Sequence, residues 1–261
     1  NVTKSKTESS MSDKIQKQQE CKNKRQALTQ IKRLKLDESL EFRGNNQKLF
    51  YEEITKNDIT FSIGPAGCGK TYIASYYALT ALATKKVDSI IITKPLVELG
   101  GEKLGFLPGD IDEKTEPFMM SIYYNMEQII GKQRLDVLRQ TGVIQVIPFA
   151  YMRGLTLANK LVILDEAQNA TPLQLKAFLT RIGMGSKYVI TGDLEQTDII
   201  KENGLEDSIK RFIGLDGVGF SRFTLEDVTR HPIVQGLLSR YKPTWVLPNT
   251  SAEITLSRYL A

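Results

Sequence analysis

The chain has 261 residues, of which 41% are hydrophobic and 25% are charged, so it is long enough to bury one substantial core. No apolar run approaches the roughly 20 residues of a membrane-spanning helix, and no secretory signal pattern opens the chain, so we expect a cytoplasmic protein without a membrane partner. A disulfide between Cys21 and Cys68 would pin a glycine-rich loop, so a reducing compartment explains the two cysteines more simply.

Positive charge is concentrated at the N-terminal end. Residues 1–36 contain ten lysines and arginines against three acidic residues, whereas the whole chain carries a net charge of +5, so the remainder is slightly acidic. Such a polar segment has too little apolar content to fold alone. We expect residues 1–40 to form a basic tail, disordered or partly helical. The tail either follows the phosphate backbone of a nucleic acid or is simply solvated, and composition does not separate the two.

Strands and helices alternate beyond the tail. The patterns predict strands at 59–63, 89–93, 143–147, 161–164, 188–190 and within 218–225, and helices at 70–84, 118–140, 172–181, 204–212 and 231–241. A Gly/Pro-rich excursion covers 94–117. This order implies right-handed crossovers and a parallel sheet with helices on both faces. We therefore predict a single α/β domain over 41–241, followed by a C-terminal extension over 242–261.

A P-loop pattern follows the first predicted strand. Its glycines let backbone N–H groups converge on phosphate oxygens at a helix N-terminus. Lys70 would reach the β- and γ-phosphates of a nucleotide, and the Thr71 hydroxyl would bind Mg²⁺. The expected nucleotide-binding residues are Gly64, Pro65, Ala66, Gly67, Cys68, Gly69, Lys70 and Thr71.

An acidic pair ends the strand predicted at 161–164. Four consecutive apolar residues are typical of a strand buried on both faces, and Asp165 and Glu166 follow directly. Asp165 would hold Mg²⁺ through water, while Glu166 would orient or deprotonate the attacking water. The structural alternative is an acidic pair that caps the next helix, which begins near Thr171-Pro172, but that alternative leaves the P-loop unexplained.

A third polar stretch, Thr191 to Gln196, emerges where the strand at 188–190 ends. Ligands bind at this edge of open α/β sheets. The amide of Gln196 is a candidate sensor of the γ-phosphate. The alternative is a polar turn built on the carboxylate of Asp193. Together the three stretches predict ATP and Mg²⁺ as cofactors.

With these residues in place, the chain resembles the PhoH family, the phosphate-starvation-inducible ATPases of bacteria and their phages. The resemblance covers about residues 41–241 and rests on particular motifs. These are Asn46-Gln47, Thr93 to Glu98, Gly105 to Asp110, Glu113-Lys114, Met152 to Gly154, Leu161 to Asn169, Thr180 to Gly183 and Asp227 to Pro232. The chain departs from the family at Cys68, where relatives usually carry Thr or Ser.

The resemblance implies a RecA-like nucleotide-binding core with motifs similar to those of superfamily-one helicases. It makes Gln47 a candidate reader of adenine, Asp165 and Glu166 the metal and base pair, and Gln196 the γ-phosphate contact. One such domain lacks the second domain that supplies arginines in helicases. We therefore expect a homo-oligomeric ring, with a hexamer favoured, and an arginine finger in cis or in trans.

Topology ranks the candidate arginines. Arg230 follows a strand that should run to the nucleotide edge, and Arg153 lies just after another such strand, whereas Arg181 should lie at the opposite edge. We favour Arg230 and place Arg153 second. A structural ion pair of Arg230 with Glu226 or Asp227 is the alternative.

Two hypotheses explain what ATP hydrolysis drives. The first is a helicase-like motor or remodeller that acts on RNA or single-stranded DNA, with Lys94 and Lys103 facing the strand. The second is an assembly or regulatory ATPase whose nucleotide state controls docking of a protein partner. Stimulation of hydrolysis by single-stranded nucleic acid would separate the two.

Overall fold

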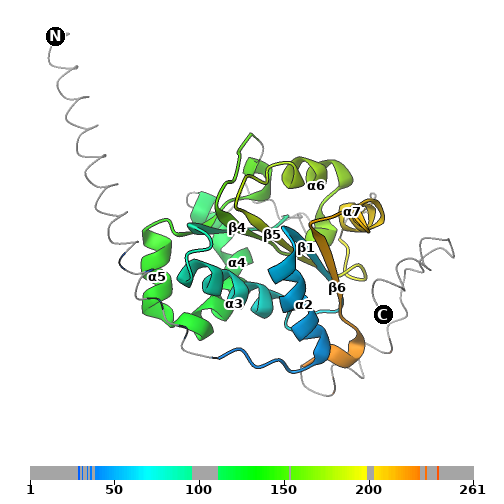
Figure 1. The fold of residues 1–261 in the computed structure, drawn as a ribbon, viewed down its shortest axis with the longest axis horizontal. Coiled ribbons are helices and arrows are strands. Elements are labelled where there is room, and N and C mark those ends of the chain that lie inside the picture. The colour runs from blue at the N-terminus through cyan, green and yellow to red at the C-terminus, as the bar shows by residue number, and fades with distance from the viewer. Residues whose placement is uncertain are drawn as a thin grey trace, which may run out of the picture.

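One parallel sheet organises the chain. The computed structural model describes residues 39–95, 111–152, 154–198 and 203–229, with Thr29, Ile31, Leu34, Leu36, Ile233 and Arg240, and for 111–116 the backbone alone. Within these residues the sheet has six strands in the order β3-β2-β4-β5-β1-β6, and every pair is parallel (Figure 1). The strands are β1 (Ile59–Ile63), β2 (Ser89–Thr93), β3 (Ile144–Val146), β4 (Lys160–Leu164), β5 (Lys187–Gly192) and β6 (Val218–Arg222).

Helices cover both faces of the sheet, as Figure 1 shows. One face carries α2 (Asn45–Lys56), α3 (Lys70–Ala83), α4 (Ile111–Ile130) and α5 (Lys132–Gln140). The other face carries the 3₁₀ turn η2 (Phe149–Met152) and the helices α6 (Pro172–Leu179) and α7 (Gly204–Phe212). Two further 3₁₀ turns are η3 (Ala167–Asn169) and η4 (Leu225–Asp227). The predicted α/β fold, a parallel sheet with helices on both faces, is confirmed.

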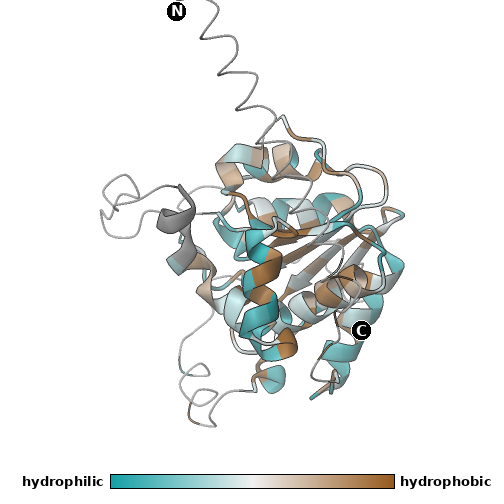
Figure 2. Cartoon of the chain, turned by 90° about the vertical axis from the view of Figure 1, so that its left-hand side faces the viewer, coloured by the Kyte–Doolittle hydropathy of each residue, from teal (hydrophilic) through white to brown (hydrophobic). Residues whose placement is uncertain are grey.

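The hydrophobic core is divided by the sheet into two clusters. Phe50 of α2 and Leu79 of α3 represent the first, and Phe178 of α6 and Tyr188 of β5 represent the second. In Figure 2 the strands of the interior are coloured largely as hydrophobic, with hydrophilic stretches on the outer sides of the helices. Because both faces of the sheet are buried, the central strand β4 is continuously apolar and buried from Leu161 to Leu164.

Most predicted elements match, but two differ. The bounds of β1, β2 and α7 are those predicted. The excursion predicted over 94–117 is wrong for its last part, because α4 already begins at Ile111 and continues through Pro117. A proline removes one backbone donor without forbidding a helix that neighbours support. Helix α2 was not predicted, and the helix predicted at 231–241 lies almost wholly outside the described residues.

The end of the N-terminal segment contributes to the core. Ile31 and Leu34 are each 8% exposed and belong to the cluster that α2, α3, α4 and α5 build. Leu36 and Leu40 pack against the same cluster. The segment predicted as a tail over 1–40 therefore has apolar side chains buried in the body of the protein.

Strand order brings the functional motifs to one edge. β1 pairs with β5 on one side and β6 on the other, and Ile63 is opposite Gly192. β4 lies between β2 and β5. Because all strands point the same way, the residues that follow β1, β2, β4 and β5 meet at the carboxyl edge. None of the helices in the described part of the chain is long and apolar enough to cross a membrane.

Candidate nucleotide site

The P-loop connects β1 to α3 through three glycines with positive φ. These are Gly64 (147°), Gly67 (91°) and Gly69 (83°), and Gly69 precedes the first residue of α3. A Cβ on Gly64 would lie 2.5 Å from the Phe223 carbonyl oxygen, so a side chain has no room there. The glycines therefore fold the loop tightly over the N-terminus of α3, which is the cradle that the sequence predicts.

Lys70 is 8% exposed at the start of α3. Its Nζ donates to the carbonyl oxygens of Gly64 at 2.5 Å and Pro65 at 2.8 Å. Burial lowers the pKa of the Lys70 ammonium, and nearby groups that include Asp193 and Asp165 oppose this shift. The ammonium thus lies inside the curve of the P-loop, among acceptors.

Asp165 follows β4 and is 7% exposed. Its Oδ1 accepts hydrogen bonds from Thr191 Oγ1 at 2.5 Å and from Thr71 Oγ1 at 3.4 Å. Burial raises the pKa of this carboxyl and the neighbouring Glu166 adds to the shift, whereas the Thr191 bond and two lysines lower it. The structure brings together the Thr71 hydroxyl, predicted to bind Mg²⁺ directly, and the Asp165 carboxylate, predicted to hold it through water.

This pair is an incomplete metal cage. Within the described residues no group of three or more His, Cys, Asp or Glu side chains is placed to hold an ion. Mg²⁺ in phosphoryl-transfer sites is held by one or two protein oxygens and completes its shell with phosphates and water. One hydroxyl and one carboxylate at the mouth of a P-loop therefore fit Mg²⁺ bound together with a nucleotide.

Glu166 has a left-handed backbone, with φ 56° and ψ 42°. A residue other than glycine rarely adopts this conformation. Here it occurs at the second residue of the acidic pair, two positions after β4 ends. Glu166 Oε1 lies 3.9 Å from Lys94 Nζ, and Glu166 Oε2 accepts a 2.6 Å hydrogen bond from Gln168 Nε2. The expectation that Lys94 faces a nucleic-acid strand stays a prediction, since in the structure its ammonium lies beside Glu166.

The stretch after β5 forms the turn that was considered as the structural alternative. Asp193 Oδ1 accepts from Glu195 N at 3.0 Å, and Gln196 N donates to the Asp193 carbonyl oxygen at 3.1 Å. Burial raises the pKa of the Asp193 carboxyl. The turn does not exclude a functional role, because it carries Gln196 to the rim of the same cavity as Lys70 and Glu166.

These groups line one cavity of about 320 Å³. Its wall also includes Tyr72, Thr229, Ser121 and Asn125. Ser121 and Asn125 come from α4 and were not predicted. The predicted residues that line it are Ala66, Gly67, Gly69, Lys70, Thr71, Asp165, Glu166 and Gln196. A larger cavity of about 510 Å³ lies on the other side of the loop, against Gly64, Pro65, α7 and β6.

Residues 39–242 match the family model described as PhoH-like protein. The chain belongs to the PhoH-like protein family. It is 46% identical over 198 residues to a PhoH-like protein of Synechocystis sp., a match that covers 75% of this chain and 60% of that protein. It is 43% identical over 205 residues to a PhoH-like protein of Bacillus subtilis, covering 78% and 64% respectively. The chain therefore spans less than two thirds of the length of these relatives.

The chain is also similar to a protein of known structure. The large terminase from a thermophilic bacteriophage is 12% identical, with a TM-score of 0.48, and the likeness covers 78% of this chain and 52% of the terminase. A likeness of this degree implies nothing about what the PhoH-like chain binds.

Gln47 of this PhoH-like chain contacts the P-loop directly. Its Nε2 donates to the Cys68 carbonyl oxygen at 2.9 Å, and its Oε1 accepts from Arg43 N at 2.9 Å. The side chain is 5% exposed, and a Cβ on Gly69 would lie 2.8 Å from Nε2. Both ends of the amide are thus bonded within the protein, and the adenine contact stays a prediction.

Cys68, the departure from the PhoH family pattern, is buried at the apex of the loop. Its Sγ donates to the Thr224 carbonyl oxygen at 3.6 Å. A thiol is a weak donor, but it fills the small space that the loop offers. The substitution is accommodated without a change in the P-loop glycines.

The arginines proposed as fingers fall outside the part of the chain that the structure describes. These are Arg153 and Arg230, and the same holds for Lys103 and Cys21. Arg181 ends the segment after α6, where its carbonyl oxygen accepts from Leu157 N at 3.0 Å. That position is near the amino ends of β4 and β5, at the sheet edge opposite the P-loop, as the topology predicts.

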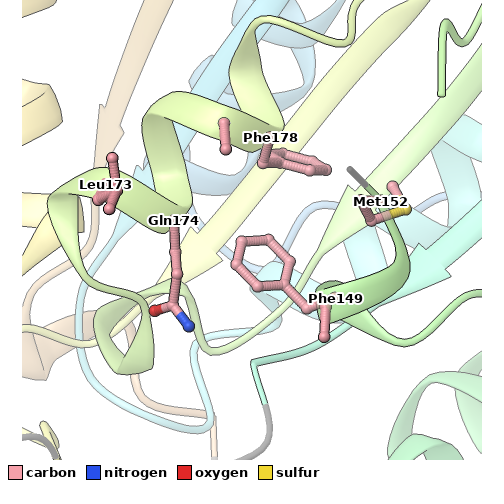
Figure 3. A pocket seen from close by; sticks show the side chains of 7 residues that line it. Phe149, Met152, Leu173, Gln174 and Phe178 are labelled. Atoms are coloured by element: carbon pink, nitrogen blue, oxygen red, sulfur yellow. The ribbon is translucent and has the colours of Figure 1, made fainter. Parts of the chain in front are cut away.

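A separate apolar cavity of about 260 Å³ lies between η2 and α6. Figure 3 shows Phe149 and Met152 on one wall and Leu173, Gln174 and Phe178 on the other. The Phe149 and Phe178 rings are 5.4 Å apart. Neither the P-loop nor the acidic pair lines this cavity, and we assign it no role.

Proposed function

We propose that this chain binds Mg·ATP and hydrolyses it to ADP and phosphate. The observation that carries the proposal is the convergence of Lys70, Thr71, Asp165, Glu166 and Gln196 on one cavity of about 320 Å³. Cavities of roughly 300–1,000 Å³ suit small-molecule ligands. The family supports an ATPase-type function, whereas the activity of this chain is inferred from its site.

Each group has a part in the reaction. The P-loop N–H groups and Lys70 neutralise the β- and γ-phosphates, and bound Mg²⁺ would be held by Thr71 and Asp165 and would stabilise charge on the phosphate oxygens. Glu166 orients the water that attacks the γ-phosphorus and accepts its proton as the bond to the β-phosphate oxygen breaks. Gln196 donates to the γ-phosphate. Most of the rate enhancement comes from positioning and charge.

The proposal extends to nucleic acid as the partner. Support comes from the basic residues of the N-terminal segment and from Lys94, which lies at the sheet edge beside Glu166. A polyanion near Lys94 would act on the same carboxylate that activates water. We therefore propose RNA or single-stranded DNA as the ligand to which hydrolysis is coupled.

A nucleotide-gated assembly ATPase is the second candidate, because α4 has an exposed, uncharged surface. Phe118, Met120 and Tyr124 are 36%, 57% and 62% exposed, on the helix whose Ser121 and Asn125 line the nucleotide cavity. A second copy of the chain covering this surface would reach the nucleotide and could supply Arg230, or failing that Arg153. A cytoplasmic homo-oligomeric ring, with a hexamer favoured, belongs to both candidate functions.

The test is steady-state ATP hydrolysis with and without single-stranded RNA, together with the mass in solution. Glu166→Gln should lower kcat by roughly 10²–10⁴-fold while KM changes little. The matched control is Glu52→Gln, which alters an exposed glutamate of α2. Stimulation by RNA that Glu166→Gln abolishes supports the motor. Hydrolysis by a ring that ignores RNA favours the assembly function, and a wild-type chain that hydrolyses no ATP refutes both.

A further inference from the structure

Gln168 is a buried amide in the middle of the proposed catalytic machinery. It lies in η3, two residues after Glu166, and is 1% exposed. The motifs of the sequence give it no role. Its side chain nevertheless contacts both of the segments that leave β4 and β5 at the carboxyl edge.

Three hydrogen bonds use both ends of this amide. Nε2 donates to Glu166 Oε2 at 2.6 Å and to the Gln196 carbonyl oxygen at 3.1 Å. Oε1 accepts from Asp193 N at 3.0 Å. A primary amide has two N–H donors and one carbonyl acceptor, and here both kinds of group are used, on Glu166 and on the turn that carries Gln196. No other side chain type offers both donors and an acceptor at this length without charge.

The surrounding backbone is shaped to receive this side chain. A Cβ on Gly192, the last residue of β5, would lie 2.9 Å from Gln168 Oε1. Thr197 Oγ1 donates to the Gln168 carbonyl oxygen at 3.3 Å, which ties the two segments a second time. The amide is therefore held between the two segments, and it cannot rotate away without leaving buried polar groups unpaired.

Glu166 needs such support more than an ordinary surface glutamate does. Its backbone is left-handed and its side chain is 37% exposed, so the chain alone does not fix where the carboxylate points. The short charge-assisted bond from Gln168 engages Oε2 and leaves Oε1 toward Lys94, 3.9 Å away. One oxygen of the carboxylate is thus restrained while the other is available to water.

We propose that Gln168 is a positioning residue that orients Glu166 for water activation and links it to the segment that carries Gln196. This inference rests on the proposed ATPase function and deepens it. Because one nitrogen donates to both Glu166 and the Gln196 backbone, a displacement of Gln196 on loss of the γ-phosphate would also release Glu166. Gln168 itself does not touch the substrate.

The test is Gln168→Met, which keeps the length of the side chain and removes its donors and acceptor. Loss of a hydrogen bond to a charged group should lower kcat roughly 10- to 100-fold. KM for ATP should stay within about threefold, because the P-loop is not touched. The matched control is Gln145→Met, since Gln145 is an exposed glutamine of β3.

A double-mutant cycle separates positioning from general structural damage. If Gln168 acts through Glu166, Gln168→Met should cost nothing further in the Glu166→Gln background, measured by single-turnover hydrolysis. An equal loss in both backgrounds, or an unchanged kcat in the single variant, overturns the inference. If Gln168→Met does not fold, Gln168→Asn, which keeps the amide but withdraws it from Glu166 by one methylene, takes its place in the same cycle.

Different results would overturn the proposed ATPase function and the positioning role of Gln168. A wild-type chain that hydrolyses ATP and loses activity with Glu166→Gln, but not with Gln168→Met, overturns this inference alone. A wild-type chain without hydrolysis overturns the proposed function and this inference with it.

Discussion

Replacing Gln47 by leucine removes two hydrogen bonds while nearly keeping the volume of the side chain. In the structure the Gln47 amide donates to the Cys68 carbonyl oxygen and accepts from Arg43 N, both at 2.9 Å. These contacts make Gln47 a support for the P-loop. The family resemblance instead makes it a reader of adenine. Gln47→Leu distinguishes the two, because a support affects all nucleotides and a reader affects only adenine nucleotides.

The size of the effect follows from the two bonds. Each neutral hydrogen bond contributes about 0.5–1.5 kcal/mol, and a buried carbonyl left without a donor costs about 1–3 kcal/mol. We expect the free energy of unfolding to fall by about 2–4 kcal/mol. For a domain of this size that is a fall in Tm of roughly 5–15 °C. If loss of the Gln47 bond to the P-loop lowers the free energy of nucleotide binding by about 1 kcal/mol, the affinity falls about fivefold.

The assay measures the affinity of the chain for ATP and for GTP by fluorescence titration, with Tm by calorimetry. Gln133→Leu, on the exposed side of α5, is the matched control. We expect Gln47→Leu to weaken ATP and GTP binding equally. A loss of about tenfold or more for ATP with GTP unchanged would refute the reasoning and assign the residue to adenine recognition.

Two further predictions concern β5. Lys187 Nζ caps α2, because it donates to the carbonyl oxygens of Ile54, Thr55 and Asn57 at 2.9, 3.2 and 2.5 Å. Lys187→Met should therefore lower the free energy of unfolding by about 1–2 kcal/mol, measured by urea titration. An unchanged free energy of unfolding would contradict this prediction. The Tyr188 hydroxyl has no hydrogen-bond partner among the described residues, and burial raises its pKa, so the folded state keeps a proton that the unfolded chain releases above about pH 10. The free energy of unfolding therefore falls as pH rises beyond that value, and Tyr188→Phe should reduce this fall. Near pH 7 the same variant should raise the free energy of unfolding by up to about 1 kcal/mol, because it removes a buried hydroxyl without a partner among the described residues. A variant that is less stable than the wild type near pH 7 would contradict the prediction.

The parts of the fold that the sequence predicts are those with a strong local signal. β1 and β2 are short apolar runs, and α7 begins after Asn203, whose side chain accepts from Leu205 N and Glu206 N. Helix α2 lacks such signals. Gly44 precedes it without a side-chain cap, and only Gln47, Phe50 and Ile54 of its twelve residues are buried. Its position depends on contacts with β6 and α3, which a local pattern does not contain.

The candidate site divides in the same way. Lys70, Asp165 and Glu166 follow from spacing, because Lys70 ends the glycine-rich loop after β1, and Asp165 and Glu166 directly follow β4. Ser121 and Asn125 have no such mark, since α4 reaches the cavity through its packing against α3, which a local pattern does not contain. The supporting role of Gln168 could have been predicted from the sequence. A glutamine that follows an acidic pair by two residues at a buried strand end needs partners, and these come from the neighbouring strand.

The position of β1 in the sheet has a consequence for synthesis on the ribosome. β1 and its P-loop are synthesised before β5 and β6, which are the strands that pair with β1. Ile59 therefore cannot pair until Tyr188 and then Val218 have been synthesised. β2 and β4 can pair with each other before that. At about 5–20 residues per second the wait is on the order of 10 s.

During that interval the apolar strand that carries the phosphate cradle has no partner in the sheet. ATP stabilises only a chain that can bind it, so nucleotide cannot assist folding until β5 and β6 have left the ribosome. The nascent chain is therefore exposed to aggregation at this unpaired strand, and a chaperone that covers Ile59–Ile63 would act before the nucleotide could.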